Sequence, residues 1–240
     1  MAVRSLYVEP ELAHQDVHWP ALEFRDVFRI YRSGPVETVA LRGLDLTIEQ
    51  GELVAVLGPS GCGKSTMLSL AAGMDEPSAG EVRAFGRSLT RMDADALAGL
   101  RAREIALVLQ SENLWPNLSA SENVAASLRL AGGDLNPGRA AVEALAAFGL
   151  RERTGHRVGQ LSGGEQQRVA IAAAAARHAS LVLADEPTGE LDRVNERVVL
   201  ESLARLRDEH RSTVVIVTHS EQVAGFADHV VEMRDGRAVT

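Results

Sequence analysis

Short apolar runs rich in branched side chains recur along this chain, and they predict buried strands. The runs lie at Leu53–Leu57, Ile105–Leu109, Leu181–Ala184, Val214–Val217 and Val230–Met233. Runs of this length without polar alternation are typical of strands covered on both faces, as in a largely parallel sheet.

Helical segments with recognisable ends lie between these runs. Asn136-Pro137 predicts a helix start, with Asn as the N-cap and Pro in the first turn. The segments expected to be helical run from Gly63 to near Gly73, from Asn136 to Gly149, from Ser162 onward, and from about Asp192 to Glu209. Strands that alternate with helices predict an α/β fold.

The chain divides into a short extension and one large domain. Residues 1–20 are polar and show no clear period, whereas residues 21–240 carry the predicted strands and helices. Within that domain the interval 111–160 lacks convincing strands, so we expect it to be a helical insertion.

Composition adds three constraints. The net charge of −8 makes the chain a poor candidate for wrapping nucleic acid, and a single cysteine favours a reducing compartment. No stretch approaches the roughly 18 apolar residues of a membrane span.

Lys64 is the one lysine among 25 Lys and Arg residues. This single lysine needs an explanation, because Lys and Arg are not interchangeable at every site.

Lys64 lies in a glycine-rich string that matches a phosphate-binding loop. Gly58-Pro-Ser-Gly-Cys-Gly-Lys-Ser65 follows a predicted strand and precedes a predicted helix, as G-x-x-x-x-G-K-[ST] requires. Backbone N–H groups and the helix N-terminus favour an anion there. We expect Lys64 to reach phosphates and Ser65 to hold Mg²⁺. The alternative is a glycine-rich turn that binds nothing.

Two acids end the run Leu181–Ala184. Asp185 is placed to hold the Mg²⁺ shell and Glu186 to polarise an attacking water, because ligands bind at the carboxyl edge of a parallel sheet. The alternative is a solvated acidic loop.

A second candidate anion site is Ser162-Gly-Gly-Glu165. It reads as a capping box in which glycines expose backbone N–H groups at a helix start. By itself a local cap is the simpler interpretation, but the longer string Leu161-Ser-Gly-Gly-Glu-Gln-Gln-Arg-Val-Ala170 is far more specific.

These strings together resemble the ATP-binding-cassette (ABC) ATPases. The phosphate loop, LSGGEQQRVA and LVLADEP stand in that family's order. The resemblance runs from about Ala21 to Arg237. Gln110 matches the family's Q-loop glutamine, the segment 189–192 its D-loop, His219 its switch histidine and Tyr31 its adenine-stacking aromatic.

The resemblance implies a P-loop NTPase (RecA-like) core with a mostly parallel sheet, an N-terminal antiparallel β part and a helical subdomain. It implies ATP and Mg²⁺ as ligands, bound between two copies that meet head to tail. The residues expected to contact nucleotide are Tyr31, Gly58, Pro59, Ser60, Gly61, Cys62, Gly63, Lys64, Ser65 and Thr66, joined from the second copy by Ser162, Gly163, Gly164 and Glu165. The expected metal ligands are Ser65, Gln110 and Asp185, and the expected catalytic residues are Glu186, His219, Gln110 and Lys64.

Within the family, the chain resembles the ATPases of macrolide and peptide exporters, lipoprotein-release systems and the cell-division complex. This implies a separate membrane permease that docks near Gln110–Trp115 and the helical subdomain, on the inner face of the membrane. Alternatives are a regulatory ATPase that signals, and an ATPase without a membrane partner. The sequence departs from the branch at Glu112, usually Phe, at Ala173, usually Arg, and at Glu190, usually Asn.

Overall fold

The computed structural model describes residues 18–34, 36–133 and 136–239 and contains two sheets. The larger sheet has the strand order β10 (Arg237–Val239), β9 (His229–Arg234), β3 (Leu53–Leu57), β8 (Thr213–Thr218), β7 (Leu181–Asp185) and β6 (Ile105–Val108). All neighbours pair in parallel except β10 with β9. The α/β fold with a mostly parallel sheet is therefore confirmed.

The smaller sheet is the antiparallel part that the resemblance implied. Its strand order is β2 (Val36–Ile48), β1 (Leu22–Ser33), β4 (Ala79–Ala84) and β5 (Arg87–Ser88). No apolar run in the sequence predicted β1 and β2, because these strands carry many exposed charged residues and their pairing is interrupted by bulges.

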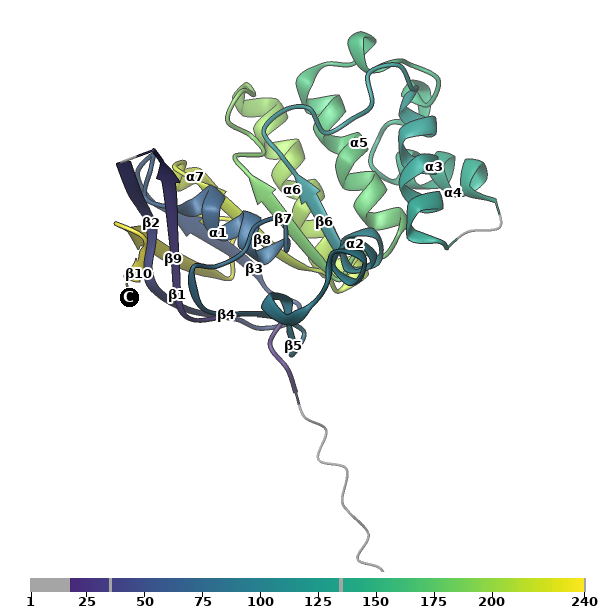
Figure 1. The fold of residues 1–240 in the computed structure, drawn as a ribbon. Helices are drawn as coiled ribbons and strands as arrows, with labels where there is room; N and C mark the ends of the chain where they lie inside the picture. Colours follow the sequence, from purple (N-terminus) through teal and green to yellow (C-terminus); the bar gives the residue numbers. More distant parts are fainter. Residues whose placement is uncertain (1–17, 35, 134–135, 240) are drawn as a thin grey trace, which may run out of the picture.

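The described helices are α1 (Lys64–Ala71), α2 (Ala94–Arg103), α3 (Ala120–Ala131), α4 (Pro137–Ala147), α5 (Gly163–Ala176), α6 (Arg193–His210) and α7 (Glu221–Ala224), with short 3₁₀ turns at Leu89–Arg91, Arg151–Arg153 and Val158–Gln160. They lie beside the larger sheet, except α3 and α4, which pack on α5 (Figure 1). The expected caps form at Asn136 and Ser162, whose side chains accept a backbone N–H at the start of their helices, and Asp192 caps its helix in the same way.

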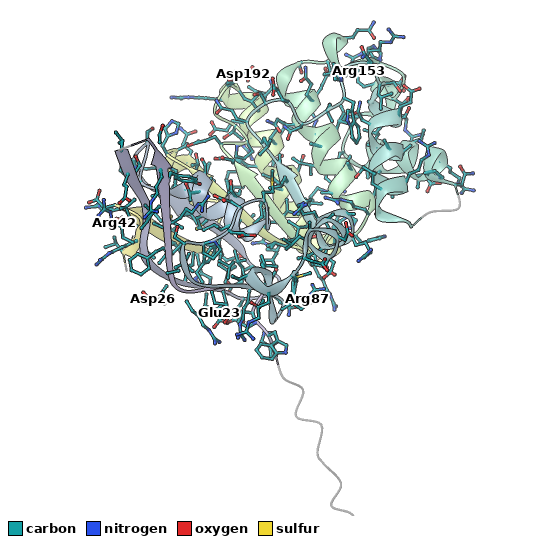
Figure 2. The ribbon with its side chains drawn as sticks, in the orientation of Figure 1. Glu23, Asp26, Arg42, Arg87, Arg153 and Asp192 are labelled. Carbon is teal, nitrogen blue, oxygen red and sulfur yellow. The ribbon has the colours of Figure 1, made fainter. Side chains whose placement is uncertain are left out.

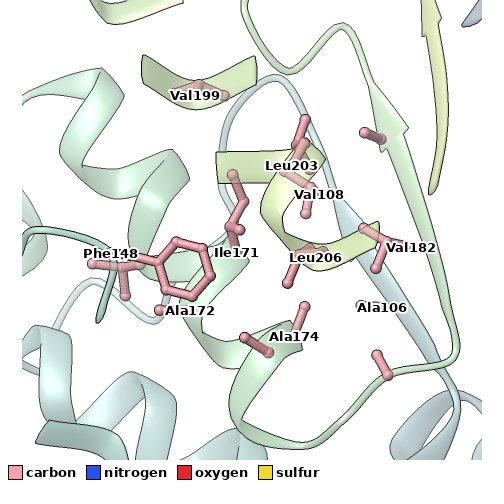
Figure 3. Packing of buried hydrophobic residues seen from close by; sticks show 14 of the residues in the cluster. Ala106, Val108, Phe148, Ile171, Ala172, Ala174, Val182, Val199, Leu203 and Leu206 are labelled. Carbon is pink, nitrogen blue, oxygen red and sulfur yellow. The ribbon is translucent and has the colours of Figure 1, made fainter. Parts of the chain in front are cut away.

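Two apolar clusters separate the layers. Side chains alternate along each strand, so one face of the larger sheet packs against α5 and α6 and the other against α1 and the antiparallel sheet. Figure 3 shows the first cluster, in which Ile171 and Ala174 of α5 lie beside Leu203 and Leu206 of α6 and Val182 of β7. Both ends of the phosphate loop are thereby anchored to buried elements.

The predicted insertion at 111–160 contains α3, α4 and no strand among its described residues. Both helices pack against α5, away from the antiparallel sheet (Figure 1). The extents of the domain and of the insertion remain predictions. Most of the extension at 1–20 lies outside the described residues.

Charged side chains lie on the outside of this layered core (Figure 2). Asp192 caps α6 by accepting from Val194 N and Asn195 N at 3.0 Å each. Arg153 pairs with Glu165 at 2.8 Å, which ties the insertion to the first turn of α5.

Arg177 at the C-cap of α5 joins that helix to α2 and β6. Its guanidinium donates to the carbonyl oxygens of Arg101 and Ala102 at 2.7 and 2.8 Å and to that of Ile105 at 2.8 Å. The first two oxygens belong to the last turn of α2, where carbonyls lack partners within the helix.

Arg177→Met is expected to lower the free energy of unfolding by about 2–4 kcal/mol, because three carbonyl oxygens lose a charged donor. Urea unfolding followed by circular dichroism measures this. The matched control, Arg139→Met, removes only an exposed pair with Glu143 and should change stability by less than about 0.5 kcal/mol. Equal effects of the two variants would contradict the bridging role of Arg177.

Candidate nucleotide site

The phosphate loop lies between β3 and α1, as predicted, and its curvature requires glycine. A Cβ on Gly58 would lie 2.3 Å from Met233 O, and one on Gly63 would lie 2.5 Å from Ala40 O. Gly61 and Gly63 also have positive φ angles of 80° and 104°. Cys62 is 5% exposed and packs in the second apolar cluster.

Lys64 is buried with its ammonium group inside the loop. Its Nζ donates to Gly58 O at 2.7 Å and to Pro59 O at 3.2 Å. These carbonyl contacts hold the positive charge at the point where a convergent set of backbone N–H groups would bind an anion. The cradle and the buried ammonium therefore fit a phosphate group.

Asp185 and Glu186 end β7 beside this loop. Burial raises the pKa of the Asp185 carboxyl, with a smaller contribution from the charge of Glu186, while a hydrogen bond with Ser65 and the charge of Lys64 oppose the rise. A carboxylate that is short of solvation beside a serine hydroxyl is a suitable ligand pair for Mg²⁺, which prefers oxygen donors. Ser65 and Asp185 thus fit the predicted metal site.

The Glu186 carboxylate is held on both oxygens. Thr218 Oγ1 donates to Oε2 at 2.8 Å, and His219 Nδ1 lies 2.9 Å from Oε1. Glu186 has a φ of 44°, a conformation that is uncommon outside glycine. The backbone is nevertheless kept in place, since Glu186 N donates to Val217 O at 2.9 Å. Thr218, which the sequence did not single out, therefore aims the candidate base.

His219 also approaches the phosphate loop. A hollow of about 260 Å³ is lined by Gly58, Pro59 and His219 together with Glu221 and Met233. The loop after β3 and the turn after β8 therefore share one surface at the carboxyl edge of the sheet, where open α/β folds bind ligands.

Gln110 lies in the segment after β6. The predicted strand to Leu109 is one residue too long, because Leu109 N leaves the ladder to donate to Asn113 Oδ1 at 2.7 Å. Gln167 of α5 is buried and donates to Leu109 O and Gln110 O, both at 2.8 Å. Gln167 and Asn113 are positioning residues that the sequence analysis did not name, although Gln167 stands within the quoted string Leu161–Ala170 and Asn113 within the range Gln110–Trp115.

The start of α5 forms the predicted capping box. Glu165 N donates to Ser162 Oγ at 3.3 Å and Ser162 N to Glu165 Oε2 at 2.8 Å. Arg153 and the Ser162 backbone lower the pKa of Glu165. A Cβ on Gly164 would lie 2.9 Å from Asn195 Oδ1, so this glycine also lets α5 approach α6.

Two groups of predicted residues stay apart in the single chain. Among the described residues, no hydrogen bond or ion pair joins Ser162–Glu165 to the phosphate loop. Tyr31 likewise interacts elsewhere: its hydroxyl donates to Asp75 Oδ2 at 2.8 Å, and the Arg29 guanidinium lies 4.5 Å from its ring centre. The roles of both groups stay predictions.

Comparison with known proteins supports this arrangement. The family model described as ABC transporter matches residues 41–189. The macrolide export ATP-binding/permease protein MacB of Hyphomonas neptunium is 44% identical over 222 residues, which are 92% of this chain and 34% of that relative. The lipoprotein-releasing system ATP-binding protein LolD of Chromohalobacter salexigens is 42% identical over 229 residues, 95% of each chain.

A solved structure shows the same fold. The dimeric ATP-binding cassette MJ0796, in a post-hydrolysis state bound to ADP and Pi, superposes with a TM-score of 0.84 at 37% identity, covering 91% of this chain and 97% of that one. The present chain spans about a third of the length of the MacB relatives that it matches.

Asp185→Asn is expected to raise the midpoint of thermal unfolding of the ligand-free protein at pH 7, by about 1–3 °C. The folded state disfavours the ionised carboxylate, because burial raises its pKa above that of the unfolded chain. Removing the charge removes that penalty, and the gain should vanish as the pH falls through the folded pKa and the wild-type carboxyl takes up a proton. Scanning calorimetry across pH measures this.

Asp228→Asn provides a control of opposite sign. Burial opposes ionisation there, but hydrogen bonds from Leu53 N at 2.8 Å and Arg207 Nη1 at 2.6 Å leave the pKa of Asp228 lowered. Its ionised form stabilises the fold at pH 7, and that contribution is lost as the pH falls through the folded pKa. The expectation for Asp185 fails if both variants lower the midpoint.

Proposed function

This chain belongs to the ABC transporter family, and from that premise we propose that it is the ATP-binding and ATP-hydrolysing part of a transporter that exports or releases a substrate from a membrane. The family implies ATP binding and hydrolysis. Relatives named for macrolide export and lipoprotein release favour transport over the signalling role of a cell-division-type ATPase.

The observation that carries the hydrolytic role is the doubly held Glu186 carboxylate at the edge of the sheet. With Thr218 and His219 on its two oxygens, Glu186 is oriented to accept a proton from an attacking water as general base. Phosphoryl transfer depends mainly on positioning and on stabilising charge, so a fixed carboxylate suits it.

Lys64 and the loop amides supply the phosphate contacts in this proposal. The Lys64 ammonium exchanges its bonds with Gly58 O and Pro59 O for phosphate oxygens. Ser65, Asp185 and Gln110 are the proposed ligands of Mg²⁺, which when bound neutralises charge on the phosphates. Tyr31 is the proposed adenine contact.

A second copy of the chain completes the site in the proposal. Ser162, Gly163, Gly164 and Glu165 lie at the N-terminus of α5, where backbone N–H groups and the helix dipole favour an anion. Among the described residues no hydrogen bond or ion pair joins them to the phosphate loop of their own chain, and the dimeric form of the similar cassette MJ0796 supports contact with the other copy.

The proposed membrane subunit docks on an apolar groove between residues 109–119, which follow β6 and are called the Q-loop segment below, and α3. The groove measures about 600 Å³ and is lined by Trp115, Pro116, Leu118, Ala126 and Leu130 among others. Trp115 and Leu130 are 50% and 66% exposed. Among the described residues no helix is long and apolar enough to cross a membrane.

The turn that presents Trp115 is held from inside. Asn123 is buried on α3, accepts from Trp115 N at 2.8 Å and donates to Ser119 O at 3.0 Å. The exposed indole therefore stands on a fixed support, which suits a docking surface better than a mobile loop would. Trp115 is also close in sequence to Gln110, so in this proposal docking is linked to the nucleotide site at the carboxyl edge of the sheet.

Glu186→Gln is expected to keep ATP binding, to reduce turnover at least about 100-fold through loss of the general base, and to accumulate an ATP-bound dimer. Phosphate release and light scattering after size exclusion measure the two effects. Glu201→Gln, on the exposed surface of α6, is the matched control and should behave as wild type. Undiminished hydrolysis in Glu186→Gln would remove the proposed role of that residue.

Trp115 should become shielded when the membrane subunit binds. A Trp19→Phe background leaves Trp115 as the single tryptophan. Adding membrane vesicles from the source organism should shift its emission to the blue and reduce quenching by acrylamide, whereas protein-free lipid vesicles should not. Val142→Ser, at an exposed position of α4, should leave the shift intact. Unchanged emission would argue against this groove as the docking surface.

A further inference from the structure

The side chain of Gln110 is bound by a residue at which this chain departs from its branch. Gln110 Nε2 donates to Glu190 Oε1 at 3.3 Å, across 80 positions of the sequence. Both residues line a cavity of about 110 Å³ between the Q-loop segment, the start of α5 and the turn after β7. Glu112, a second acidic departure, lines the same cavity.

The backbone of Gln110 is already fixed by other contacts. Gln167 Nε2 donates to its carbonyl oxygen at 2.8 Å, and Gln167 Oε1 accepts from Asn113 Nδ2 at 3.0 Å. Gln167 is 4% exposed and belongs to a helix in the first apolar cluster. The remaining freedom of Gln110 is therefore the direction of its side-chain amide.

The turn after β7 brings Glu190 to that amide. Gly189 N donates to Glu186 O at 3.1 Å, which closes the turn, and a Cβ on Gly189 would lie 3.4 Å from Gln110 Nε2. The Gln110 amide therefore lies at about van der Waals distance from this turn. The same turn carries the proposed base, Glu186, and the carboxylate that binds Gln110.

A carboxylate and an amide constrain Gln110 differently. An ionised carboxylate accepts hydrogen bonds and cannot donate, so it selects the NH₂ end of the Gln110 amide and turns the oxygen the other way. Asn or Gln at position 190 would offer both a donor and an acceptor, and either direction of the Gln110 amide would then be satisfied.

We propose that Glu190 is a positioning residue that fixes the Gln110 amide with its oxygen available to the divalent cation of the nucleotide site. The proposal rests on the proposed function, in which Gln110 is a metal ligand. Glu190 itself touches neither nucleotide nor metal; it acts through the hydrogen bond to Gln110 Nε2.

The test measures metal binding directly and does not depend on turnover. In a Glu186→Gln background loaded with ATP, Mn²⁺ affinity is read by electron paramagnetic resonance, and affinity for a fluorescent ATP analogue is read in the presence of EDTA. Glu190→Met, which keeps the length of the side chain and removes the acceptor, should weaken Mn²⁺ binding about 3- to 10-fold, as expected for loss of one net hydrogen bond. Nucleotide affinity in EDTA should be unchanged.

Two controls separate orientation from charge. Glu112→Gln removes a second carboxylate from the same cavity. Among the described residues Glu112 has no hydrogen bond to Gln110, so this change should weaken Mn²⁺ binding less than 2-fold. In a Gln110→Ala background, Glu190→Met should have no further effect, because the group that Glu190 orients is gone. Thermal unfolding confirms that each variant is folded.

Three results would overturn the role of Glu190: equal weakening by Glu112→Gln, no weakening by Glu190→Met, or full weakening by Glu190→Met in the Gln110→Ala background. Failure of the Glu186→Gln parent to bind ATP and Mn²⁺ would instead overturn the proposed function, and the role of Glu190 with it.

Discussion

The parallel hydrogen-bond register of β3, β8, β7 and β6 is the constraint on which the site depends. Leu57 pairs with Thr218, Asp185 with Val217 and Val108 with Ala184, so the carboxyl ends of the four strands lie side by side. Each strand then delivers one candidate element: the phosphate loop, the switch histidine, the acidic pair or Gln110. A shift of one residue in any pair would move a candidate site residue to the other face of the sheet.

The second requirement is a link from this edge to the helical insertion. Gln167 of α5 and Asn113 of the Q-loop segment bind each other and the backbone of Leu109 and Gln110. Trp115 follows only two residues after Asn113 and is itself supported by Asn123. The proposed docking groove is thus connected to Gln110 through a short chain of amides, of which Asn123 and Gln167 are buried and Asn113 is half-buried.

Local signals made part of this arrangement predictable. The caps at Asn136, Ser162 and Asp192 depend on residues within three positions, and the buried strands depend on short apolar runs, so both could be read directly. The antiparallel sheet could not be predicted from local signals, because β1 pairs with β4 far along the chain and the pairing of β1 is interrupted after Arg25. Only the family resemblance implied this sheet. The contact between Gln110 and Glu190 likewise spans 80 positions and has no local signature.

The isolated lysine acquires a physical reason from this geometry. All Lys or Arg positions of the chain except Lys64 are arginine. At position 64 the ammonium fits inside a loop and donates to two carbonyl oxygens, which belong to the residues six and five positions earlier. A planar guanidinium presents a wide fork, whereas an ammonium is a compact charge whose donors can be redirected from carbonyls to phosphate. Burial likewise disfavours the ionised form of Asp185, because it raises the pKa of that carboxyl. A poorly solvated carboxylate is stabilised when a cation binds it, so binding of a divalent cation at Asp185 would stabilise the edge of the sheet.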